Sequence, residues 1–122
     1  MQVVLNTIMI YAKDMKRTAD FYKEHFGFHT SGDVVEGLIE LTSQPSGTTL
    51  LIHQAAKSLK LGQASVKLVF SVKDIEGFKV KSAECGLVFG SIHQANGYEF
   101  ANAKDPDKNT VSISSRAYRG SK

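Results

Sequence analysis

The chain has 122 residues, of which 42% are hydrophobic, and it carries a formal net charge of +3 and one cysteine, Cys85. This length and apolar content are typical of one folded domain, and the absence of a membrane-length apolar run or a leader pattern predicts a cytoplasmic protein with no membrane partner. One cysteine excludes an internal disulfide, and scattered basic residues argue against a nucleic-acid partner.

An alternating apolar run over residues 3–12 predicts the first strand. Alternation places successive side chains on opposite faces of a sheet, so a helix can bury one face and leave the other open. The face expected under a helix carries Ile8, Ile10 and Ala12, and the other carries Leu5, Thr7, Met9 and Tyr11.

A helix is predicted directly after this strand, over residues 14–26. Asp14 can cap its N-terminus, and Gly27 can end it in the left-handed conformation that glycine tolerates. An apolar stripe recurs between them at helical spacing, formed by Met15, Ala19, Tyr22 and Phe26. We expect this stripe to cover the first strand.

Three strands are predicted after the helix, because short apolar runs alternate there with turn residues. They cover residues 28–33, 34–42 and 48–54, with a tight junction near Gly32-Asp33 and a turn at 44–47. A stretch rich in Lys, Ser, Gly and Gln at 55–64 is interpreted as a connector. Residues 1–54 therefore form a module with the order βαβββ.

A second, looser copy of this module begins sixty residues later, where Lys73-Asp74 repeats Lys13-Asp14. An internal period of about half the chain indicates two related modules. We expect an α+β fold in which two curled, mixed sheets carry their helices on the outer face. The second module would occupy residues 65–116, before a basic tail at 117–122. Its predicted elements are a strand at 65–72, a helix at 74–85, which Gly77 weakens, and strands at 87–93, 98–104 and 110–115.

Motifs at both ends of the chain resemble a known group. Asp14 with Phe21-Tyr22 and Gly27 looks like the opening signature of the vicinal oxygen chelate superfamily, and the turn at residues 105–109 resembles its terminal DPDGN turn. That superfamily includes glyoxalase I, bleomycin and fosfomycin resistance proteins, extradiol dioxygenases and methylmalonyl-CoA epimerase. The resemblance covers nearly the whole chain. It implies paired βαβββ modules and, usually, a homodimer with small-molecule cavities.

The turn departs from the family pattern at Lys108, where the family normally has glycine. That position tends to need a positive φ. We expect Asn109 to take up part of this geometry, because asparagine tolerates it best after glycine.

The resemblance also implies metal-ligand positions on the first and fourth strand of each module. Carried onto this chain they fall on Thr7, Leu51, Lys67 and Ser112, and none is a usual metal ligand. A charged ammonium has no lone pair for a metal and repels a cation, so we expect no metal cofactor. A divalent ion would have to use His53, which a slip of one residue would bring into place, together with Glu40 or other ligands.

We expect a cavity lined by the inner faces of the two sheets to bind a small neutral or anionic molecule. Lys67 could pair with an anionic group of the ligand or with a carboxylate such as Glu40. His93 and Tyr98 could border the cavity mouth. Two alternatives stay open: a metal-dependent lyase, isomerase or dioxygenase that uses His53, and a non-catalytic regulatory module. The expected ligand-binding residues are Thr7, Met9, Tyr11, Leu51, His53, Lys67 and Ser112.

Overall fold

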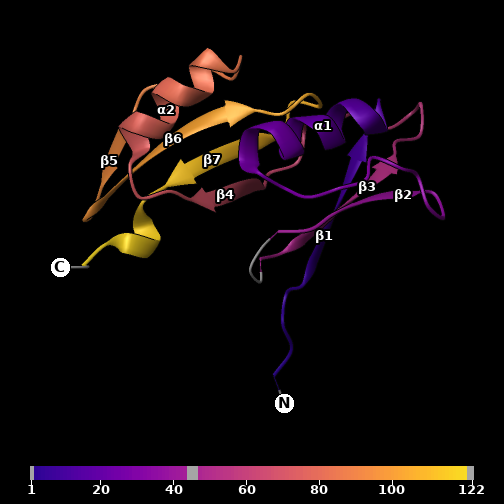
Figure 1. The fold of residues 1–122 in the computed structure, drawn as a ribbon, viewed down its shortest axis with the longest axis horizontal. Coiled ribbons are helices and arrows are strands. Elements are labelled where there is room, and N and C mark those ends of the chain that lie inside the picture. Colours follow the sequence, from indigo (N-terminus) through magenta and orange to yellow (C-terminus); the bar gives the residue numbers. More distant parts are fainter. Residues whose placement is uncertain (1, 44–46, 121–122) are drawn as a thin grey trace. The chain divides into compact units, whose positions relative to one another are not determined.

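The computed structural model describes residues 2–43 and 47–120 and divides the chain into two compact units, Met1–Leu61 and Gly62–Lys122 (Figure 1). Each unit contains one α-helix and one mixed sheet, so the α+β prediction is confirmed. In the described part of the chain, no helix is both long and apolar enough to cross a membrane.

The first unit has the order strand, helix, strand, strand. Its sheet has the order β1-β3-β2, in which β1 runs parallel to β3 and β2 runs antiparallel to it. The elements are β1 (Thr7–Ala12), α1 (Met15–Phe26), β2 (Leu38–Leu41) and β3 (Thr49–Gln54).

The faces of β1 are as the alternation predicts. Ile10 and Ala12 are buried, whereas Met9 and Tyr11 are 42% and 44% exposed. On the helix, the buried residues are Thr18, Ala19 and Tyr22, so only the middle of the predicted stripe is fully enclosed. Tyr22 anchors the packing, and its ring meets that of Phe28 edge to face at 6.2 Å between centroids.

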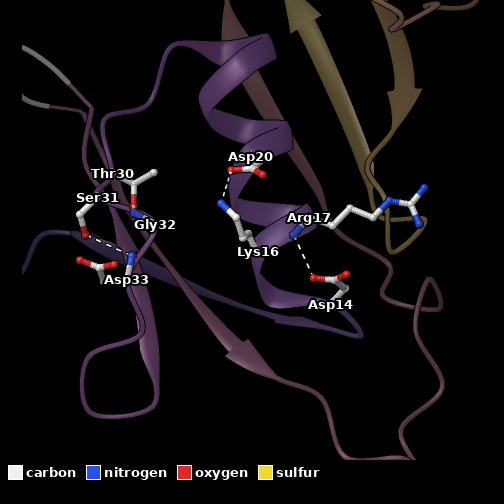
Figure 2. Close-up of polar contacts among 8 residues, drawn as sticks. All are labelled: Asp14, Lys16, Arg17, Asp20, Thr30, Ser31, Gly32 and Asp33. Atoms are coloured by element: carbon white, nitrogen blue, oxygen red, sulfur yellow. Dashed lines mark hydrogen bonds and ion pairs between the residues drawn. The ribbon is translucent and has the colours of Figure 1, made fainter.

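Both ends of α1 form as the sequence predicts. The side chain of Asp14 accepts a hydrogen bond from the backbone N–H of Arg17 at 3.1 Å (Figure 2). Gly27 ends the helix at φ 74°, and its N–H bonds back to the carbonyl of Lys23 at 3.2 Å. The strand and helix are therefore joined by residues 13 and 14 alone.

The predicted strand at 28–33 is wrong, because only His29 forms a bridge, to Thr42. The next residues turn instead of extending: the hydroxyl of Thr30 accepts from Gly32 N–H, and that of Ser31 accepts from Asp33 N–H (Figure 2). Such short side-chain bonds compete with strand pairing.

The predicted strand at 34–42 is correct only in its second half. Val35 and Leu38 bridge across a two-residue turn, in which Glu36 and Gly37 have φ values of 51° and 80°. Two successive positive φ values are typical of a tight hairpin turn. The turn is therefore at Glu36-Gly37, and β2 begins at Leu38; of the turn predicted at 44–47, residues 44–46 lie outside the described residues.

The second unit has a four-stranded sheet with the order β4-β7-β6-β5, in which only the β4–β7 pair is parallel. A short 3₁₀-helix, η1 (Arg116–Tyr118), follows the last strand. In Figure 1, α2 lies on one side of this sheet and the C-terminal coil, drawn in yellow, on the other. The elements are β4 (Lys67–Ser71), α2 (Ile75–Glu84), β5 (His93–Ala95), β6 (Tyr98–Lys104) and β7 (Thr110–Ser114).

The predicted strand at 87–93 forms only at its last residue, where β5 begins. Leu87 and Phe89 are nevertheless buried, and Gly90 N–H bonds to the carbonyl of Asn102 at 2.9 Å. The apolar residues of this run are therefore buried, but they do not pair as a regular strand.

Gly77 has a specific place at the start of α2. Asp74 caps this helix by accepting from Gly77 N–H at 3.0 Å, and a Cβ on Gly77 would collide with the same carboxylate. Glycine therefore lowers the intrinsic helix propensity here but leaves room for the cap.

The turn between β6 and β7 is organised by Asp105, whose side chain is buried. Its Oδ1 accepts from the N–H groups of Asp107 and Asn109, both at 2.9 Å, and its Oδ2 accepts from the Asn109 side chain at 3.0 Å. Lys108 itself adopts φ 68°. The expectation that Asn109 would take up part of this geometry is wrong, because Asn109 is not among the residues with a positive φ and bonds to Asp105 instead.

Candidate functional site

The sheet of the first unit has a face that turns away from α1. Strand pairing lines up three rows of side chains on it. These rows are Thr7 and Thr49; Met9, Leu51 and Glu40; and Tyr11, His53 and Leu38.

Tyr11 and His53 form an aromatic pair at one end of this face. Their ring centroids lie 5.2 Å apart with a tilt of 52°, and Nδ1 of His53 lies 2.8 Å from the carbonyl of Gln54. Pairing with Tyr11 places His53 two residues beyond Leu51 on the same face. A register slip of one residue would therefore not bring His53 into the position of Leu51.

A pocket of about 720 Å³ lies beside β2, entirely within the first unit. Its lining includes Leu38, Glu40 and Leu51 from the open face, together with residues 28–35 of the turn region after α1. Of the predicted ligand-binding residues, only Leu51 lines it. The described residues that line it are Lys23, Phe28, His29, Thr30, Ser31, Asp33, Val35, Leu38, Glu40, Thr42 and Leu51.

The sheet of the second unit also has a face that turns away from its helix. The buried apolar side chains of β6 and β7, among them Ala101 and Ile113, point toward the helix side, so the alternate residues form the open face. Its residues are Lys67, Val69 and Ser71 from β4; Thr110, Ser112 and Ser114 from β7; Tyr98, Phe100, Asn102 and Lys104 from β6; and His93 and Ala95 from β5.

Lys67 lies across this open face. Its Nζ donates to Oδ1 of Asn102 at 3.3 Å and stands 4.8 Å from the centroid of the Phe100 ring. An amide oxygen and an aromatic face attract an ammonium without neutralising it. Lys67 therefore keeps its positive charge exposed and available to an anion.

Ser112 has a different environment from the other predicted site residues. It is 1% exposed, and its hydroxyl donates to the carbonyl of Ala101 at 3.1 Å. The hydroxyl proton is thus engaged within the β6–β7 pair.

Several residues on or near the open face were not predicted from the sequence. Phe100 and Asn102 contact Lys67, while Arg116 and Arg119 both lie 5.9 Å from the ring of Tyr98. The period-two alternation of residues 98–104 could have indicated Phe100 and Asn102. No pattern in the sequence links the C-terminal arginines to Tyr98.

The positions that the resemblance assigns to a metal do not fit a divalent ion. Thr7 donates its hydroxyl proton to Asn6 at 2.7 Å, Leu51 has no donor atom, and Lys67 is a cation. Within residues 2–43 and 47–120, no three His, Cys, Asp or Glu side chains gather where they could hold a metal ion. A metal site of the usual N and O ligands cannot be built on this donor set.

Comparisons with known proteins agree with this architecture. The model of the Glyoxalase/Bleomycin resistance protein/Dioxygenase superfamily matches residues 4–113. The chain is 27% identical to an uncharacterized protein, YetH, of Bacillus subtilis (strain 168), over 86% of this chain and 92% of that protein.

Two solved structures have the same fold at low sequence identity. Lactoylglutathione lyase from Agrobacterium tumefaciens has a TM-score of 0.72 at 17% identity, over 93% of this chain and 94% of that one. TnmS3, an antibiotic binding protein from Streptomyces sp. CB03234, has a TM-score of 0.76 at 18% identity, over 92% and 94%. The two units thus define a protein with vicinal-oxygen-chelate architecture. The chain belongs to the Glyoxalase/Bleomycin resistance protein/Dioxygenase superfamily.

Proposed function

We propose that this protein binds a small neutral or anionic organic molecule on its open sheet faces, without a divalent metal. The main support for this proposal is Lys67. Its ammonium lies on an open face among an amide and a ring, and that face has no carboxylate in the residues that the structure describes. Such a site favours an anion and disfavours a metal ion.

The first unit, considered by itself, offers apolar contacts to a small molecule. Met9 and Tyr11 are each more than two-fifths exposed on a sheet face, and Leu51 joins that face to the pocket. A volume of about 720 Å³ is in the range of small-molecule sites, which combine apolar walls with a few polar groups. The carboxylates of Asp33 and Glu40 make this pocket unfavourable for an anionic ligand and suited to a neutral one.

The likeness to TnmS3 supports binding as a function for this architecture, because that protein is described as antibiotic binding. The likeness to lactoylglutathione lyase supports the alternative, an enzyme. The residues at the metal positions favour the first, because Thr7, Leu51, Lys67 and Ser112 lack a carboxylate and an imidazole. The exposed ammonium of Lys67 repels a cationic ligand, so charge favours a neutral or anionic one.

The test is a ligand screen on the purified full chain, followed by calorimetric titration of the ligand found. Lys67→Glu should weaken an anionic ligand by more than tenfold, because it replaces attraction by repulsion. Lys60→Glu makes the same charge change on the exposed connector and should change the affinity less than twofold. Equal affinity of both variants and the unchanged chain would refute the role of Lys67.

The same purified protein tests the metal-free part of the proposal. Elemental analysis should find less than about 0.1 divalent ion per chain, and added divalent ions should not raise the melting temperature, since only a bound ligand stabilises the folded state. One tightly held ion per chain would instead support a metal-dependent lyase, isomerase or dioxygenase.

We also propose that the protein is a homodimer. Val3, Val4 and Leu5 are 88%, 85% and 74% exposed, and they precede β1, which is an edge strand of its sheet. Consecutive exposed apolar residues at a sheet edge are typical of surfaces that another chain covers. Light scattering should give twice the chain mass, and Val4→Lys should lower it; a monomer at every concentration would refute this.

A further inference from the structure

Three rings form a cluster on the open face of the second unit. His93 and Phe100 stack with centroids 5.0 Å apart and planes tilted by 29°, and Tyr98 lies 6.4 Å from Phe100. We call these three residues the ring cluster. They come from β5 and β6, which pair directly, so strand register fixes their spacing.

Three cations surround the ring cluster. The Nζ of Lys67 lies 4.8 Å from the centroid of Phe100, and the Cζ atoms of Arg116 and Arg119 each lie 5.9 Å from that of Tyr98. We call these three residues the cationic rim. The rim comes from two separate elements, because Lys67 opens β4, whereas Arg116 and Arg119 belong to the segment around η1.

No carboxylate of the described residues shares this face. The acid in β6, Glu99, alternates to the other face, where Gln94 donates to its Oε2 at 2.6 Å. Asp105 and Asp107 are buried in the turn after β6. The positive charge of the rim is therefore not balanced by an acidic side chain of the same sheet face.

We propose that this face binds a planar aromatic anion, such as an aromatic carboxylate. The proposal names the ligand class of the binding function above and depends on it. The ring of the ligand would stack on the exposed ring of His93 or tilt against that of Tyr98, because Phe100 is already in contact with His93 and Lys67. Its anionic group would pair with the rim, where a guanidinium can bond both oxygens of a carboxylate.

The geometry favours an aromatic anion over an aliphatic one. The rim cations lie over the rings, so an anion that approaches them also meets an aromatic surface. A flat ligand satisfies both surfaces, whereas an aliphatic carboxylate uses only the charge. A cationic aromatic molecule would stack equally well but would meet the repulsion of three cations.

The experiment uses three matched probes and the isotope-labelled full chain. The probes are 2-naphthoate, which is aromatic and anionic; 2-naphthylmethylamine, which is aromatic and cationic; and cyclohexanecarboxylate, which is anionic and not aromatic. Amide shifts in a titration give both the affinity and the location. We expect naphthoate to bind about tenfold more tightly than either other probe, with the largest shifts at residues 98–102 and 116–119.

Two variants separate the aromatic and the charged part of the site, and a third variant serves as control. Tyr98→Leu should weaken naphthoate several-fold by removing the stacking surface, and Arg119→Gln should weaken it several-fold by removing charge. Lys81→Gln removes the same charge from the exposed end of α2 and should change the affinity less than twofold. The melting curve of each variant shows whether it is folded.

Several results would overturn the proposal. These are no shift with naphthoate at about 10 mM, equal affinity for the three probes, or an equal loss in Lys81→Gln. Tighter binding of a short oligothymidine, with a steep salt dependence, would assign the face to single-stranded nucleic acid instead. If naphthoate fails while another ligand depends on Lys67, only this inference fails. If naphthoate binds only with an added divalent ion, the metal-free function fails.

Discussion

Lys108→Gly should stabilise the protein, because Lys108 adopts φ 68° in the turn between β6 and β7. A residue with a Cβ pays about 1–2 kcal/mol for the left-handed conformation. Glycine avoids this strain but loses about 0.5–1 kcal/mol more conformational entropy on folding. The expected gain in the free energy of unfolding is therefore about 0.5–1 kcal/mol, or roughly 3 °C in melting temperature.

Gly62 supplies an independent measure of the same geometry. A Cβ on Gly62 would lie 2.7 Å from the Cβ of Lys108 and 3.3 Å from the carbonyl of Asp107. Gly62→Ala should thus be more harmful in the natural chain than in the Lys108→Gly background, where one of these clashes is absent. We expect a coupling free energy of about 1 kcal/mol between the two sites.

Urea unfolding of the four proteins of this cycle is the assay, with Lys108→Ala as control. The control removes the charge and the long side chain but keeps the Cβ, so it should give no gain. If Lys108→Gly is no more stable than Lys108→Ala, backbone strain is not the reason. If Gly62→Ala costs the same in both backgrounds, the close approach of the two Cβ positions is wrong.

Two further predictions use the same assay. Glu36→Asn should raise the free energy of unfolding by about 0.5 kcal/mol, because asparagine tolerates the positive φ of this hairpin turn better than glutamate does. The control, Glu36→Ala, should give no gain. A lower free energy of unfolding in Glu36→Asn would contradict the turn geometry. Ser112→Ala should lower the free energy of unfolding by about 1 kcal/mol, since the buried hydroxyl of Ser112 donates to the carbonyl of Ala101. The control, Ser71→Ala, changes an exposed serine and should be neutral. Equal effects of the two substitutions would refute the role of the Ser112 hydrogen bond.

Elements that depend on local chemistry could be predicted from the sequence. The cap at Asp14, the stop at Gly27 and the alternation in β1 each involve residues close together in the chain, and all three are confirmed. The first half of the strand predicted at 34–42 is wrong, because Glu36-Gly37 forms a tight hairpin turn without the Asn-Gly or Asp-Gly signal of such a turn. A single sequence could not show that Glu36 accepts a positive φ.

The site depends on pairing between distant strands, which the sequence does not specify. Alternation alone placed Thr7, Met9 and Tyr11 on one face. Alternation could not predict the partners of Lys67, because Phe100 and Asn102 come beside it only through the register of β4 with β7 and of β7 with β6. A shift of one residue in either pair would have put different side chains beside the ammonium.

Comparison of equivalent rows shows where the two modules have diverged. The row of Met9, Leu51 and Glu40 in the first unit corresponds by strand pairing to Val69, Ser112 and Asn102 in the second. The helix-facing row of Ile10, Ile52 and Ile39 and its counterpart of Phe70, Ile113 and Ala101 are both apolar, because they form the cores that hold each helix. The open rows are not constrained by this packing, so a carboxylate in one module can become an amide in the other without loss of the fold. We therefore expect substitutions of exposed open-face residues to change ligand choice, and those of buried residues, Ser112 included, to change stability.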